Sequence, residues 1–72
     1  MARLIHKTYA FGKDGQKHIF EAFEKAAIMG APYVVCLDGA FLTTCEAGYE
    51  VREEIEDTIK WYGWSRINPN LS

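Results

Sequence analysis

The hydrophobic pattern of the first half of the chain predicts a strand followed by a helix. Residues 3–11 place apolar side chains among polar ones, as a half-buried strand does. Asp14 is expected to cap a helix that runs from about Gly15 to Met29 and ends at Gly30. The apolar residues of that helix occupy one half of a helical wheel: Ile19, Phe20, Ala22, Phe23, Ala26, Ala27 and Met29.

The middle of the chain predicts a hairpin. Two apolar runs, residues 33–37 and 40–44, flank Asp38-Gly39, a dipeptide typical of a type I′ turn because both of its positions need positive φ. This turn pairs Cys36 with Phe41, Val35 with Leu42 and Val34 with Thr43. Cys45 then lies about 13 Å along the strand from the partner of Cys36, at ~3.3 Å per residue. Since a disulfide needs Cα atoms within about 7 Å, we expect both cysteines to be reduced.

A second helix is predicted from about Gly48 to Tyr62. Its buried stripe consists of residues spaced by four, four and three: Val51, Ile55, Ile59 and Tyr62. Gly63 suits the left-handed position after the last turn, and Trp64 is expected to close on Ile59.

These elements predict an α+β fold in the order β-α-β-β-α, a three-stranded sheet with two helices packed on one face. Residues 1–65 are expected to form a single compact domain, and residues 66–72 a flexible C-terminal tail.

Composition narrows the class of protein. A chain of 72 residues with 49% apolar and 14% aromatic residues supports one folded domain and not two. No apolar run approaches the ~20 residues of a membrane span, and the first residues do not read as a signal peptide, so the sequence predicts a cytoplasmic protein. The net charge is −2, and residues 46–60 hold six acidic residues against two basic ones. Without a basic stripe, we expect no direct contact with nucleic acid or membrane.

The candidate chemistry is sparse. The histidines and cysteines do not have the spacing of a zinc site. The acidic pairs Glu53-Glu54 and Glu56-Asp57 fall on an exposed helix side. The glycines of residues 11–17 lack the spacing of a phosphate-binding loop. The sequence therefore predicts no catalytic residue, no metal site and no cofactor, and a protein that is not an enzyme.

Apolar residues at positions that should face water predict an interface instead. Ile28 and Trp61 fall on the polar sides of their predicted helices, and the hairpin is apolar on both faces, with Val34 and Phe41 on the face away from Val35. An acidic rim surrounds them, formed by Glu50, Glu53, Glu54 and Asp57. We therefore expect a homo-oligomer that also binds a protein partner, such as a basic nucleic-acid-binding effector.

A small-ligand binder is the alternative hypothesis. The predicted helix N-terminus at Lys13, Gln16 and Lys17 suits the phosphates of a nucleotide. Tyr9, Phe11 and Trp64 are the aromatic residues available to stack on its base.

The second half of the chain resembles a group of small proteins. This half is similar to small uncharacterised accessory proteins of bacterial phages and mobile elements. The similar segments are residues 33–41, residues 44–46, Glu53-Glu54-Ile55 and Gly63-Trp64. In those proteins an apolar strand, an Asp-Gly turn, an aromatic strand and an acidic helix ending in Gly-Trp recur. The resemblance implies a compact accessory role, in which some members block host defence by binding an effector or sequestering a nucleotide signal.

Overall fold

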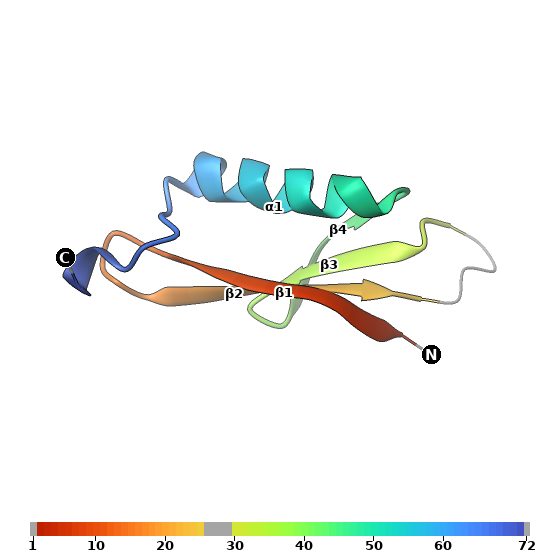
Figure 1. The fold of residues 1–72 in the computed structure, drawn as a ribbon, viewed down its shortest axis with the longest axis horizontal. Helices are drawn as coiled ribbons and strands as arrows, with labels where there is room; N and C mark the ends of the chain where they lie inside the picture. The colour runs from red at the N-terminus through yellow and green to blue at the C-terminus, as the bar shows by residue number, and fades with distance from the viewer. Residues whose placement is uncertain (1, 26–29, 72) are drawn as a thin grey trace.

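The computed structural model describes residues 2–25 and 30–71 as a four-stranded antiparallel sheet with one helix along one of its faces (Figure 1). The strands are neighbours in chain order: β1 (Arg3–Phe11), β2 (Lys17–Glu24), β3 (Tyr33–Leu37) and β4 (Ala40–Cys45). Helix α1 (Gly48–Tyr62) follows, and then the short 3-10 helix η1 (Pro69–Leu71). The molecule is elongated, with extents of 45 × 19 × 16 Å.

The predicted fold of three strands and two helices is wrong. Residues 17–24, expected in the first helix, form strand β2 and pair with β1 on one side and β3 on the other. The predicted β-α-β-β-α order is therefore replaced by β-β-β-β-α. Residues 26–29 of the predicted helix, including Ile28, lie outside the described residues.

The turn between β1 and β2 explains this error. The backbone N–H of Gln16 donates to the Asp14 carboxylate at 3.0 Å, which is the bond of an Asx turn. An aspartate that caps a helix makes the same bond, to the N–H two residues later. Local bonding at Asp14 therefore fits a turn and a helix start equally well, and the pairing of β2 with both neighbours decides between them.

The apolar pattern of β2 was ambiguous for a second reason. Phe20 and Ala22 are fully buried and point toward α1, whereas Ile19 and Phe23 point to the other face and are half-buried. Because a strand with apolar residues on both faces does not alternate strictly, its pattern also fits one side of a helix. Phe23 therefore lies on the face of the sheet away from α1, and not in the core as predicted.

The β3–β4 hairpin is confirmed, with one shift of register. Asp38 and Gly39 have φ of 52° and 83°, as a type I′ turn needs. Cys36 pairs with Phe41 as expected, but a bulge beyond that pair moves Val35 opposite Thr43 and Cys45 opposite Tyr33. The two cysteines are free thiols, and strand alternation places them on opposite faces of the sheet.

Helix α1 has the predicted bounds. At its start the Glu50 carboxylate accepts the Ala47 N–H at 2.9 Å. At its end Gly63 is left-handed, with φ of 71°, and the Trp64 N–H donates to the Ile59 carbonyl at 3.0 Å, which is a Schellman closure. The helix buries Val51, Ile55 and Ile59. Tyr62, predicted on this stripe, is instead 53% exposed.

The segment after α1 returns to the sheet. Trp64 packs on the core and stacks between His18 (ring centroids 3.9 Å apart) and Tyr62 (4.5 Å). Ser65 forms an antiparallel bridge with Phe11, with hydrogen bonds of 2.7 and 2.9 Å. Farther along, the Asn70 amide donates to the Asp14 carbonyl at 3.2 Å. These contacts join residues 65–70 to the β1–β2 end of the molecule, and the independent motion of a tail stays a prediction.

Candidate functional site

The sheet face opposite α1 carries apolar side chains from all four strands. The helix lies along one side only (Figure 1), and the register places one set of side chains from each strand on the other side. Phe41 is 68% exposed and Tyr9 is 47% exposed. We call this surface the open face, and its apolar members are Leu4, Tyr9, Phe11, Ile19, Phe23, Val34, Cys36 and Phe41.

Charges on the open face are few and partly paired with neighbours. Lys7 and Glu21 lie opposite each other across β1 and β2, and Glu21 in turn lies opposite Cys36. The Lys17 ammonium lies 4.1 Å from the centre of the Tyr9 ring, a cation–π contact. The open face is therefore mostly apolar, and its charged residues are Lys7 on β1 and Lys17 and Glu21 on β2.

The predicted interface residues divide between two surfaces. Val34 and Phe41 lie on the open face. Trp61, which is 85% exposed, comes two residues after the buried Ile59, which at ~100° per residue is the far side of α1 from the sheet. The acidic residues of the predicted rim, Glu50, Glu53, Glu54 and Asp57, lie on that same outer side. A hollow of about 440 Å³ there is lined by Arg52, Glu53, Glu56 and Asp57. The described residues of the predicted interface therefore lie on two opposite surfaces, and not in the single apolar patch with an acidic rim that the sequence predicted.

The residues of the alternative ligand site also separate. Tyr9, Phe11 and Lys17 meet at one end of the open face, where the two rings are 5.9 Å apart. Lys13 and Gln16 are exposed in the adjoining turn. Trp64 lies on the other face, against His18. Because residues 12–16 connect strands β1 and β2 and Lys17 begins β2, no helix N-terminus is present there, and that part of the nucleotide hypothesis is wrong.

A histidine–aspartate pair sits beside the core and resembles a base with its orienting carboxylate. His18 Nδ1 lies 2.9 Å from Asp38 Oδ2, and Asp38 Oδ1 accepts the Ile19 N–H at 2.8 Å. Burial raises the pKa of Asp38. The hydrogen bonds with His18 and with the Ile19 N–H, together with the charge of His18, lower that pKa by more than burial raises it, so the pKa is below its ordinary value. In the described part of the chain no hydroxyl or thiol is hydrogen-bonded to His18. The hydrogen bonds of the Asp38 carboxylate with His18 and Ile19 connect the β3–β4 turn to strand β2.

The other candidate groups for chemistry are possible metal ligands and the thiol of Cys45. Within residues 2–25 and 30–71, no three His, Cys, Asp or Glu side chains come close enough to hold a metal ion. Cys45 is 4% exposed, and burial raises the pKa of its thiol, as do the charges of Glu54 and Glu50. A thiol so placed is a poor nucleophile. Among the described helices, none is long and apolar enough to cross a membrane.

Comparison of the chain with protein-family models, with curated proteins and with solved structures finds no match.

Sequence reasoning missed Ile19 and Phe23 as members of the open face because it assigned them to a helix. The missed signal is a repeated dipeptide. Asp14-Gly15 has the same residues as the correctly identified turn at Asp38-Gly39, and Gly15 also has a positive φ, of 84°.

Proposed function

We propose that this protein is a non-catalytic binding module whose open face binds the open face of a second copy. The observation that carries the proposal is the run of half-buried and exposed apolar side chains on that face, from Tyr9 on β1 to Phe41 on β4. Monomeric proteins rarely leave contiguous apolar patches larger than a few hundred Å² exposed to water.

The size of the open face suits a dimer. Four strands at about 4.8 Å spacing give a width of about 19 Å, and strands of this length extend about 17–30 Å. The face therefore covers roughly 400–500 Å² per copy, or about 800–1,000 Å² for two copies. Specific interfaces start at about 1,200 Å² of total buried surface. Since projected area understates accessible area, the face matches a small, reversible dimer.

A second copy is the favoured occupant for two further reasons. The described core holds eight buried residues, and a domain this small gains stability from assembly. Two sheets pack face to face at about 10 Å with their side chains interdigitated. In a twofold arrangement each contact occurs twice, so Lys7 of one copy can meet Glu21 of the other while Glu21 meets Lys7.

Sedimentation of the wild type and two matched variants tests the proposal. We expect a concentration-dependent monomer–dimer equilibrium for the wild type. Phe41→Ser should weaken the dimer by about 30-fold or more, the effect of losing a ~2 kcal/mol hot spot. Trp61→Ser removes an exposed aromatic from the opposite side of the molecule and should leave the dimer unchanged. A wild type that stays monomeric at all concentrations, or a dimer lost with Trp61→Ser and kept with Phe41→Ser, would contradict the proposal.

We infer a separate role for the outer side of α1, which the open-face dimer leaves free. Trp61 with the acidic residues around it complements a basic protein surface, since aromatic anchors hold an interface and peripheral charges steer its formation.

An arginine-rich peptide is a suitable probe. Its affinity should fall with added salt and with Glu53→Lys plus Glu54→Lys, while the dimer persists. Unchanged affinity in that double variant would refute this role. That such binding blocks a host defence effector, as some small accessory proteins of phages and mobile elements do, follows from the resemblance alone and stays a prediction.

A further inference from the structure

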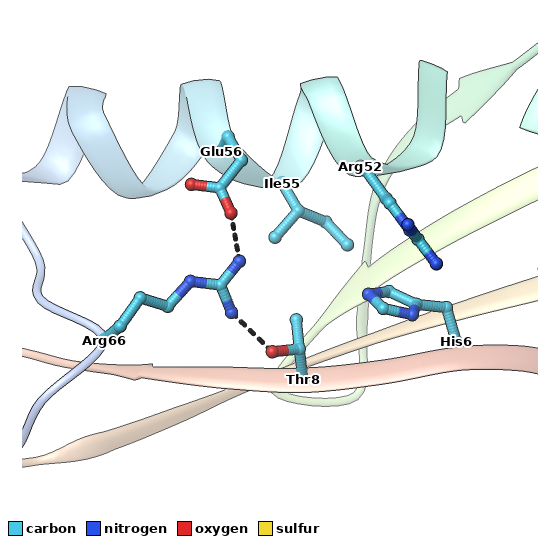
Figure 2. A pocket seen from close by; sticks show the side chains of 6 residues that line it. All are labelled: His6, Thr8, Arg52, Ile55, Glu56 and Arg66. Carbon is cyan, nitrogen blue, oxygen red and sulfur yellow. Dashed lines mark hydrogen bonds and ion pairs between the residues drawn. The ribbon is translucent and has the colours of Figure 1, made fainter. Parts of the chain in front are cut away.

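A pocket of about 240 Å³ lies between α1 and strand β1, on the face of the sheet away from the proposed dimer contact. Three parts of the chain line it (Figure 2). Strand β1 contributes His6 and Thr8, the segment after α1 contributes Arg66, and α1 contributes Arg52, Ile55 and Glu56. Ile55 is 1% exposed and belongs to the core. The pocket therefore has an apolar side and a polar lining from three elements far apart in the sequence.

One of the two arginines holds the pocket together. The Arg66 guanidinium donates to Thr8 Oγ1 and to the Glu56 carboxylate, as Figure 2 shows. It also reaches the Tyr9 carbonyl at 3.4 Å. This ion pair balances the negative charge of Glu56 inside the pocket. Because a guanidinium has five N–H donors, Arg66 keeps two that these three bonds do not use.

Arg52 and His6 lie on the other side of the pocket and have no such partners among the described residues. Arg52 makes no hydrogen bond or ion pair with any described residue, and neither does the His6 ring. In Figure 2 the Arg52 guanidinium extends from the helix to the His6 imidazole on β1, across the pocket from Arg66. In a chain with a net charge of −2, this pocket gathers two arginines and a histidine around one carboxylate that is already paired.

We propose that this pocket binds a phosphate group, as an inorganic ion or as the terminal group of a phosphate ester. Guanidinium groups bind phosphate through paired, charge-assisted hydrogen bonds. Donors that converge from α1, β1 and the segment after α1 suit a tetrahedral anion better than a planar carboxylate. A phosphate monoester carries about −1.5 to −2 charges at pH 7. Arg52 supplies a positive charge for it, and His6 and the unused N–H groups of Arg66 supply further hydrogen-bonding groups, while Arg66 remains paired with Glu56.

The size of the pocket limits its ligand. Pockets for drug-sized molecules span about 300–1,000 Å³, so 240 Å³ accepts a phosphate group and not a whole nucleotide. This pocket is separate from residues 13–17, where the sequence predicted a phosphate site, and from the open face.

Titration with inorganic phosphate at constant ionic strength, followed residue by residue by NMR, tests the proposal. We expect saturable shifts of the amide signals of His6, Thr8 and Arg52. Arg52→Gln should weaken binding about ten- to a hundredfold, the effect of one lost charge-assisted hydrogen bond. Because Arg52 has no hydrogen-bond or ion-pair partner in the described part of the chain, this variant should keep the wild-type spectrum elsewhere. Arg3→Gln removes the same charge from a surface pair with Glu24 and is the matched control; it should bind as the wild type does.

Three results would overturn the proposal. The first is phosphate binding of equal strength in the wild type and Arg52→Gln. The second is shifts that do not saturate, or that spread over the surface lysines and not the pocket. The third is acetate binding as tight as phosphate, which would make the pocket a general anion site. If Arg52→Gln fails to fold, His6→Gln takes its place, and undiminished phosphate binding in that variant would equally overturn the proposal.

Discussion

Replacement of two phenylalanines three residues apart distinguishes strand from helix at residues 17–24. In a helix, Phe20 and Phe23 would share one face and would cost similar stability when truncated. In strand β2 they point to opposite faces. Phe20 is 0% exposed and part of the core, whereas Phe23 is half-buried on the open face. Phe20→Ala should therefore cost about 3–5 kcal/mol, as buried phenylalanines do. Phe23→Ala should cost about half of the ~1.5–3 kcal/mol that full burial contributes.

Urea denaturation in a Phe41→Ser background, which removes the contribution of the proposed dimer, measures both free energies of unfolding. A 72-residue domain has a total stability of about 4–11 kcal/mol, so Phe20→Ala should remove between about a quarter and all of it. The milder pair Phe20→Leu and Phe23→Leu should show the same order if the alanine variant does not fold. Equal losses at the two positions would refute the strand assignment and restore the helix.

Three other predictions follow from single positions. Because the pKa of Asp38 is lowered in the fold, its carboxylate stabilises the protein above the ordinary value of 3.8 and this stabilisation is lost as the pH falls through the lowered pKa. Asp38→Asn keeps a favourable turn residue and should flatten the acid limb of a stability–pH curve; identical acid limbs would contradict the role of this pair. Gly63→Ala should cost about 1–2 kcal/mol in urea denaturation, since its φ of 71° is strained for alanine. Space is not the cause, because an added Cβ would meet no atom within 4 Å. Trp61→Ala should change the free energy of unfolding by less than about 0.5 kcal/mol, because this side chain is 85% exposed; a larger loss would place Trp61 in the core.

The elements that local chemistry determines were predictable from the sequence. The bounds of α1, its left-handed Gly63 and the Asp38-Gly39 turn depend on residues close together in the chain, and all three are as predicted. Strand β1 also has its predicted bounds. The wrong prediction is the helix at residues 17–24. Just before these residues, Asp14 accepts one hydrogen bond that occurs both in a turn and at a helix start. Pairing with β1 and β3, which is not local, decides the outcome there.

The candidate surfaces were less predictable because they depend on that pairing. Assigning Ile19 and Phe23 to a helix hid two members of the open face. The wheel of α1 placed Trp61 on the outer side correctly, but only the position of the sheet shows that Phe41 faces the opposite way. The phosphate pocket joins His6, Arg52 and Arg66 from three elements, and no spacing in the sequence relates them.

The natural thiol at the centre of the open face offers the most direct measurement of the proposed dimer contact. Cys36 lies on that face between Glu21 and Phe41, whereas Cys45 is buried on the helix side. Labelling of the native protein with a maleimide, at concentrations below and above the dimer transition, compares the two. We predict that labelling of Cys36 slows as the dimer fraction rises, that Phe41→Ser removes this dependence, and that Cys45 reacts slowly throughout. A wild type that sediments as a dimer while Cys36 reacts at the same rate at every concentration would place the interface elsewhere and contradict the account.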